Sequence, residues 1–148
     1  MWLKENHTTI SVSDMEKALA FYRDLVGMKV RMDTGPTPRP NNPFMEKLFD
    51  MKGITWRVCQ LDIDDSYVLE LIQWHTPTPK PSPADSQPKD IGVHWHCLYH
   101  TDVDGVYQKL KAAGVRFISE PQEFVPGIKS VFCLDPDGNW IEIHSPRH

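Results

Sequence analysis

The fold is decided by a stretch that occurs twice, first as SDMEKALAFYRDLVGMKV at residues 13–30 and again as TDVDGVYQKLKAAGVRF at residues 101–117. Each copy begins with a helix-capping residue, continues with apolar residues at helical spacing, and reaches a glycine that ends the helix before a strand. Each half of the chain later closes on an apolar strand that contains a glutamate, VLEL at 68–71 and WIEI at 140–143. An internal repeat of this kind predicts two similar structural units.

The first half predicts a strand, a helix and three further strands. Thr8–Val12 is β-branched and apolar, which favours a strand. Ser13 is the expected N-cap of the helix, with Glu16 at the capping-box position, and Gly27 is its expected end. A short helix at 44–51 is expected before a strand at 54–61.

The second half predicts the same order. Residues 97–99 form the expected first strand, and Thr101 is the expected helix cap. Residues 135–139, DPDGN, are typical of a tight turn between two strands at 130–134 and 140–143. The chain therefore reads as β-α-β-β-β, repeated once.

Proline marks the joints of the chain. Four prolines fall in Pro36–Pro43 and five in Pro77–Pro88, and both stretches predict surface loops, because proline lacks an N–H donor and has a fixed φ. The second stretch also suits a linker in the polyproline II conformation. We therefore expect a single domain over 1–148, built from module one at 1–74, a linker at 75–89 and module two at 90–148.

The composition fits one globular domain and excludes several classes of protein. The chain has 148 residues, is 40% hydrophobic and carries a formal net charge of −4. No apolar run reaches the roughly 18 residues of a membrane span, the first residues MWLKEN lack the apolar region of a secretory signal, and there is no basic stripe for nucleic acid. Three cysteines without CxxC spacing predict a reducing compartment, so we expect a cytoplasmic protein.

Several fragments occur in a familiar order. They are His7-x-x-Ile10-x-Val12-x-Asp14, Phe21-Tyr22, Leu69-Glu70-Leu71, Asp102-Val103-Asp104, LKAAGV at 110–115 and DPDGNWIE at 135–142. In this order and duplicated, they resemble the vicinal oxygen chelate superfamily, which includes glyoxalase I, methylmalonyl-CoA epimerase, extradiol dioxygenases and bleomycin-resistance proteins. The resemblance implies an α+β fold in which two tandem βαβββ modules form a curved mixed sheet around a cup. It also implies a divalent metal in that cup.

The resemblance assigns metal ligands residue by residue. It implies His7, Glu70 and Glu142, and the fourth position, as far before Asp102 as His7 is before Asp14, is Trp95, where the family usually has histidine. Strand alternation turns Trp95 toward the cup and His96 away from it. A one-residue slip of the strand would bring His96 inward. The fourth ligand is therefore His96, its neighbour His94, or absent because of Trp95.

This ligand set predicts a metal-dependent lyase or isomerase. One imidazole and two carboxylates suit Mn²⁺, Fe²⁺, Ni²⁺, Co²⁺ or Zn²⁺, and the resemblance implies a small carbonyl or thioester substrate that reacts through a metal-stabilised enediolate. Glu142 or Glu70 would move the proton. The other reading is structural, with His7 as a hydrogen-bonded strand residue and the glutamates exposed on a half-solvated sheet.

The substrate pocket is expected to contain four further side chains, namely Trp95, Tyr99, Trp140 and Arg57. Arg57 could pair with an anionic substrate, or it could be a solvated charge on a strand. The expected partners are a small molecule and a second copy of the chain in a homodimer, with neither nucleic acid nor a membrane. The cup could form within one chain or across the dimer.

Two other functions remain open at this point. A metal-free protein that binds and sequesters a drug-like molecule would use Trp95 to fill the cup and stack on the ligand. An Fe²⁺ extradiol dioxygenase is disfavoured, because its two-histidine, one-carboxylate triad needs a second histidine that this sequence lacks at the expected position.

Overall fold

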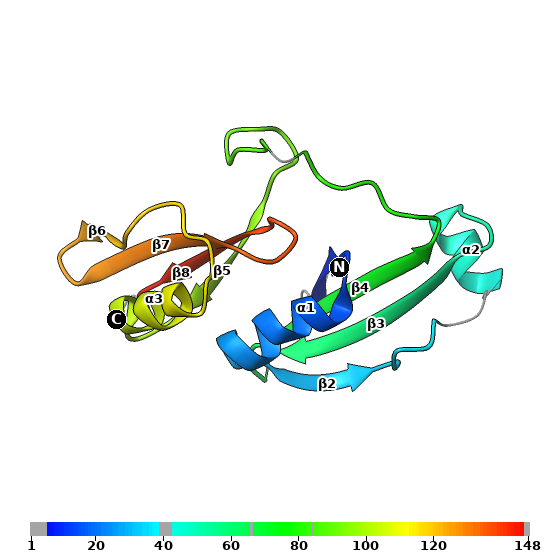
Figure 1. Cartoon of the computed structure of the whole chain (residues 1–148), viewed down its shortest axis with the longest axis horizontal. Coiled ribbons are helices and arrows are strands. Elements are labelled where there is room, and N and C mark those ends of the chain that lie inside the picture. The colour runs from blue at the N-terminus through cyan, green and yellow to red at the C-terminus, as the bar shows by residue number, and fades with distance from the viewer. Residues whose placement is uncertain (1–5, 39–42, 66, 84, 147–148) are drawn as a thin grey trace, which may run out of the picture. The chain divides into compact units, whose positions relative to one another are not determined.

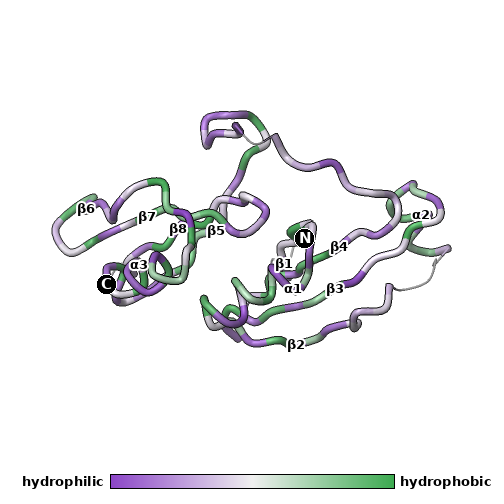
Figure 2. Tube along the Cα trace, in the orientation of Figure 1, coloured by the Kyte–Doolittle hydropathy of each residue, from purple (hydrophilic) through white to green (hydrophobic). Residues whose placement is uncertain are grey.

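The chain forms two compact units, Met1–Pro81 and Ser82–His148 (Figure 1). The structure is a computed structural model that describes residues 6–38, 43–65, 67–83 and 85–146. The boundary between the units falls inside the predicted linker at 75–89, in a segment that is mostly polar (Figure 2). Part of the first proline-rich stretch, residues 39–42, lies outside the described residues.

Unit one is a four-stranded mixed sheet with helices. Its elements are β1 (His7–Ser11), α1 (Met15–Leu19), the π-helical continuation η1 (Ala20–Val26), β2 (Lys29–Asp33), α2 (Pro43–Phe49), β3 (Thr55–Asp62) and β4 (Val68–Thr76). The strand order is β1-β4-β3-β2, with β1 parallel to β4 and the other pairs antiparallel.

Unit two repeats this arrangement. Its elements are β5 (Trp95–Tyr99), α3 (Val103–Ala112), β6 (Gln122–Val125), β7 (Ile128–Leu134) and β8 (Trp140–His144). The strand order β5-β8-β7-β6 again has one parallel pair, β5 with β8, followed by antiparallel pairs. The predicted α+β class with two βαβββ modules is confirmed.

Side-chain alternation gives each sheet two faces. In unit one the helix face carries Leu69 and Leu71 of β4 beside Cys59 of β3, all buried, together with the buried Met15 and Leu19 of the helix. The opposite face carries Glu70, and we call it the carboxylate face. Unit two has the same division, with Ile141 and Ile143 on its helix face and Glu142 on its carboxylate face.

Each helix begins one residue later than the sequence predicted. The N-cap of α1 is Asp14, not Ser13, because one carboxylate oxygen of Asp14 accepts hydrogen bonds from the backbone of residues 16 and 17 at 3.0 and 3.1 Å. The N-cap of α3 is Asp102, not Thr101, and it accepts from Gly105 N at 2.8 Å. The first helix ends at Gly27 as predicted, since this glycine takes the left-handed conformation with φ of 95°.

Helix α2 covers one end of the carboxylate face of unit one. Ile54, Trp56 and Ile72 are buried there, and Met45 and Met51 pack against them. The polar end of the same face, around Glu70, is left outside this apolar cluster. Among the described residues, no helix is long and apolar enough to cross a membrane.

Candidate functional site

Glu70 lies within a polar group on the carboxylate face of unit one. Thr9 and Gln60 are its register partners on β1 and β3. Thr9 Oγ1 donates to Glu70 Oε1 at 3.1 Å, Gln60 Nε2 donates to Glu70 Oε2 at 2.8 Å, and His7 Nε2 lies 3.9 Å from Glu70 Oε1. We call His7, Thr9, Gln60 and Glu70 the Glu70 cluster.

The imidazole and carboxylate of the Glu70 cluster could supply two of the ligands of a divalent metal ion. Metal–ligand distances are about 2.0–2.2 Å for imidazole nitrogen and carboxylate oxygen, so one ion can span ligand atoms up to about 4 Å apart. The 3.9 Å between His7 Nε2 and Glu70 Oε1 is within that span. Thr9 and Gln60 hold the Glu70 carboxylate in place by hydrogen bonds, as the neighbours of metal ligands commonly do. Across the described part of the chain, no three His, Cys, Asp or Glu side chains gather closely enough for a metal ion.

Glu142 occupies the equivalent place in unit two. In unit one His7 pairs with Val68, two residues before Glu70, and in unit two Trp95 pairs with Trp140, two residues before Glu142. Trp95 Nε1 donates to Glu142 Oε2 at 3.0 Å, and Ser130 Oγ donates to Glu142 Oε1 at 2.6 Å. Both carboxylate oxygens therefore accept a hydrogen bond from a neutral donor of the same unit.

The side chains around Glu142 in unit two do not supply the ligands of the expected metal site. Trp95 stands where a second histidine would stand, and an indole N–H can only donate a hydrogen bond. Its donor points at the carboxylate oxygen that a metal would need. In β5, β7 and β8, Glu142 is the one carboxylate on the carboxylate face of unit two.

The predicted ligand His96 lies on the wrong face. It pairs with Ile141 on β8, so it belongs to the helix face, whereas Cys97 pairs with Glu142. The one-residue slip that would have turned His96 inward is therefore absent. His94 shares the parity of His96 and lies before the strand, where its Nδ1 is 3.3 Å from the carbonyl oxygen of Gly92.

Aromatic side chains surround Glu142. The ring of Phe132 lies 5.7 Å from the ring of Trp95 and 5.7 Å from that of Trp140, at interplanar angles of 85° and 71°. The rings of Tyr99 and His144 form a second edge-to-face pair at 5.8 Å. Three predicted pocket residues, Trp95, Tyr99 and Trp140, thus share one sheet face.

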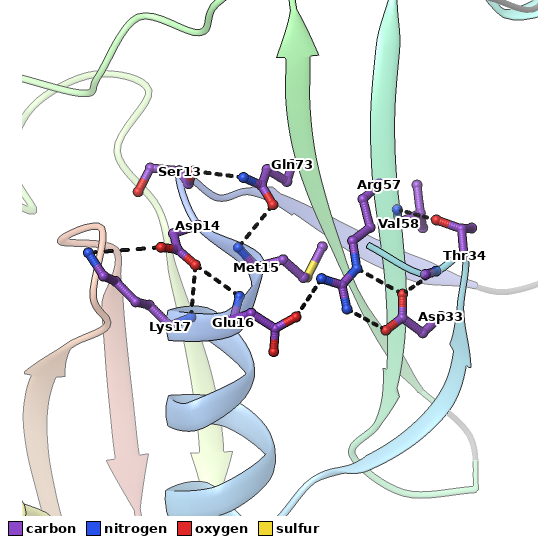
Figure 3. Close-up of polar contacts among 11 residues, drawn as sticks. Ser13, Asp14, Met15, Glu16, Lys17, Asp33, Thr34, Arg57, Val58 and Gln73 are labelled. Atoms are coloured by element: carbon purple, nitrogen blue, oxygen red, sulfur yellow. Dashed lines mark hydrogen bonds and ion pairs between the residues drawn. The ribbon is translucent and has the colours of Figure 1, made fainter. Parts of the chain in front are cut away.

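Arg57, the fourth predicted pocket residue, is not available to a ligand. It lies on the helix face, is 6% exposed, and forms two hydrogen bonds with Asp33 at 3.0 and 2.6 Å and one with Glu16 at 2.6 Å (Figure 3). Asp33 raises the pKa of Arg57, and Arg57 in turn lowers that of Asp33. Alternation along β3 puts Arg57 on the other sheet face from Gln60 and Glu70, so its side chain does not share the carboxylate face.

Four residues of these clusters were not singled out from the sequence: Thr9, Gln60, Ser130 and Phe132. Thr9 and Gln60 pair with Glu70, and Phe132 pairs with Glu142. Ser130 pairs with His144, two residues after Glu142 on the same face. Pairing β3 with β4 and β7 with β8 as hairpins, counted outward from the turns, could have found Gln60 and Phe132.

Cys97 gives a measurable report on the charge of Glu142. Partial burial of the Cys97 sulfur and the neighbouring Glu142 carboxylate raise the pKa of this thiol to about 11, desolvation being the larger cause. The Glu142→Gln substitution removes the negative charge beside Cys97, so the pKa of the thiol should fall and a larger fraction should be thiolate at a given pH. We expect iodoacetamide to alkylate Cys97 about two- to fivefold faster at pH 9, measured by mass spectrometry of the native protein.

The matched control for this prediction is Glu120→Gln, which removes an exposed carboxylate outside β5, β7 and β8. Cys59 and Cys133 are buried and should stay unmodified in every variant. An unchanged alkylation rate in Glu142→Gln would show that the carboxylate does not act on Cys97.

Comparison with known proteins agrees with this architecture. A protein of Bacillus subtilis (strain 168), YwbC, described as uncharacterized, is 26% identical over 140 residues, which is 93% of each chain. The metallothiol transferase FosB of Lysinibacillus sphaericus (strain C3-41) is 25% identical over 95% of this chain and 80% of its own. The crystal structure of a glyoxalase family protein from Bacillus cereus superposes with a TM-score of 0.86 at 13% identity, covering 98% of this chain and 95% of that one, which shows a shared fold.

The family assignment rests on nearly the whole chain. The model of the Glyoxalase/Bleomycin resistance protein/Dioxygenase superfamily matches residues 4–143, which include both glutamates and every strand except the last residue of β8. The chain therefore belongs to the glyoxalase, bleomycin resistance protein and dioxygenase superfamily.

Proposed function

We propose that this protein is a metal-dependent lyase or isomerase that acts on a small carbonyl or thioester compound. The observation that supports the proposal is the placement of His7 Nε2 at 3.9 Å from Glu70 Oε1 on neighbouring parallel strands. The Glu70 side chain is 18% exposed and that of His7 is 38% exposed, so both are partly shielded and still reachable. His7 and Glu70 are the residues that would hold the metal.

The other members of the Glu70 cluster would position the carboxylate. Gln60 and Thr9 each donate to a different oxygen of Glu70, which fixes the plane of the carboxylate. A divalent ion bound there would supply Lewis-acid polarisation of a substrate carbonyl. A glutamate would then take the proton from the carbon beside that carbonyl, and the two candidates for this role are Glu70 and Glu142.

Similarity to the metallothiol transferase supports the metal but does not identify the reaction. The name of that relative states that it uses a metal and transfers a thiol, and the two chains are 25% identical. The substrates to screen first are therefore thiol adducts of 2-oxoaldehydes and epimerisable acyl-CoA thioesters. A third screen should combine a thiol with a small electrophile and follow the addition of one to the other.

The test is metal binding to protein purified without chelator. We expect about one Mn²⁺, Fe²⁺, Ni²⁺, Co²⁺ or Zn²⁺ per chain by elemental analysis and calorimetry, and at least about a hundredfold weaker binding in His7→Ala and in Glu70→Gln, because each variant removes a direct ligand. Glu142→Gln tests whether the Glu142 carboxylate also binds metal.

The matched control is His75→Ala, which removes an exposed histidine from the end of β4. Metal affinity should not change in this variant, whereas it should fall in His7→Ala. If the parent protein binds none of these ions, or if His7→Ala and His75→Ala bind them equally, the metal-dependent function is wrong.

One observation favours a second function, that of a metal-free binding protein. The indole of Trp95 occupies the place of a ligand and donates to Glu142. With Trp140 and Phe132 it offers an aromatic wall of the kind that stacks on planar or apolar ligands. In that case the chain would bind a small molecule tightly without turning it over.

A further inference from the structure

We propose that the carboxylate face of unit two binds a small organic cation, an ammonium group carried on an alkyl or aromatic body. Glu142 would supply the negative charge, and Trp95 and Trp140 would supply aromatic surface. This inference does not rest on the metal-binding function proposed for His7 and Glu70.

The charge of Glu142 is not neutralised by a basic side chain on this face. The side chains of β5, β7 and β8 on this face include one carboxylate, that of Glu142, and the aromatic rings of Trp95, Tyr99, Phe132 and Trp140. This set contains no lysine and no arginine, and the hydrogen bonds recorded for Glu142 come from a hydroxyl and an indole, which carry no charge. A ligand cation would supply the counter-charge that no lysine or arginine of these strands provides on this face.

Three aromatic rings of this face are not stacked flat on one another. Trp95 comes from β5, Phe132 from β7 and Trp140 from β8, and the steep angles of 85° and 71° make two aromatic corners instead of a flat stack. Aromatic faces attract cations through their quadrupole, tryptophan most strongly. Trp95 is 43% exposed and Tyr99 is 69% exposed, so a ligand can reach this face.

The hydrogen bonding of Glu142 favours an organic cation over a metal ion. A metal needs lone pairs, but the group that is hydrogen-bonded to Glu142 Oε2 is the donor-only indole of Trp95. A soft, poorly hydrated ammonium group needs only a carboxylate at close range and ring faces around it.

The experiment uses the full chain with EDTA and benzyltrimethylammonium as the probe. Benzyl alcohol and benzenesulfonate serve as the neutral and anionic comparisons, and binding is followed by tryptophan fluorescence and by calorimetry. We expect the cation to bind at least about tenfold more tightly than either comparison, since the charge contributes directly to binding.

Two variants locate the site. Glu142→Gln keeps the shape of the side chain and can still accept from the Trp95 indole, so we expect it to fold normally and to weaken binding of the cation about tenfold. Glu120→Gln, which loses the same charge at an exposed position outside these strands, should bind the cation like the parent protein.

Equal affinity for the cation and benzyl alcohol, or equal affinity of Glu142→Gln and Glu120→Gln, would overturn the proposal. So would displacement of the probe by Zn²⁺ or Mn²⁺, measured without EDTA, if Glu142→Gln abolished that displacement, because Glu142 would then be a metal ligand. Loss of metal binding in His7→Ala with the cation still bound would leave this proposal standing and confirm the other independently.

Discussion

Replacing Arg57 with alanine should lower the free energy of unfolding by about 3 kcal/mol, the lower end of the range for a broken buried ion pair. Arg57 is 6% exposed, and its guanidinium makes a two-point contact with Asp33 that joins β3 to the end of β2. Its third hydrogen bond reaches Glu16 in the first turn of α1. The substitution leaves a space in the protein and an Asp33 carboxylate, with its side chain 27% exposed, without its cation.

The measurement is urea denaturation of the full chain followed by circular dichroism. Arg23→Ala is the matched control, because Arg23 also makes two hydrogen bonds with an aspartate, Asp24, but both side chains are about half exposed. Exposed pairs contribute about 0–1 kcal/mol. Glu16→Gln should also have a small effect, since the Glu16 side chain is 69% exposed. Equal losses in Arg57→Ala and Arg23→Ala would contradict the prediction.

The same pair predicts a pH dependence. Hydrogen bonding to Arg57 lowers the pKa of Asp33 below its ordinary value of about 3.9. The stability gained from a depressed carboxyl pKa is fully present above the unfolded-state value and is lost as the pH falls through the folded-state value. The difference in stability between parent and Arg57→Ala should therefore be constant from pH 5 to pH 7 and should shrink below about pH 4.

Strand periodicity predicted the division of each sheet into two faces, and the register explains why this worked. Apolar residues on both sides of Glu70 and Glu142 indicated that the two glutamates face away from the helices, and the buried Leu69, Leu71 and Ile141 agree with this. The same alternation put Trp95 on the face of Glu142 and His96 on the other. Period-two patterns are local, so one sequence suffices to read them.

The contacts of Arg57 could not be predicted in the same way. Its partner Asp33 is 24 residues away and is brought close by the pairing of β2 with β3, which contains a register shift between Val30 and Met32. A bulge of this kind is set by the packing of the whole sheet. The helix caps were misplaced for a simpler reason, because Ser13 and Asp14 are both good caps and only the backbone geometry decides between them.

Replacing Trp95 with histidine should create a second His–Glu pair and with it a metal site in unit two. Trp95 has the same register relative to Glu142 that His7 has relative to Glu70. At present the Trp95 indole donates a hydrogen bond to the Glu142 carboxylate. An imidazole at the same position would instead place a nitrogen lone pair beside that carboxylate. We expect affinity for Ni²⁺ or Zn²⁺ to increase at least about tenfold, about 1.4 kcal/mol, while binding of benzyltrimethylammonium should weaken because the best aromatic surface is lost.

The gain is best measured by calorimetry in the His7→Ala background, so that metal binding by unit one does not obscure it. Trp95→Phe removes the indole without adding a ligand and should gain no affinity for either ion. Adding Glu142→Gln to Trp95→His should abolish the gain, since a single imidazole is a weak site. If Trp95→His bound metal no better than Trp95→Phe, position 95 would not reach the coordination sphere of Glu142. The two units would then share a backbone arrangement but not the ability to bind metal at this position. A gain in affinity that depends on Glu142 would mean that the side chain at position 95 alone decides whether this face binds metal or presents an aromatic surface.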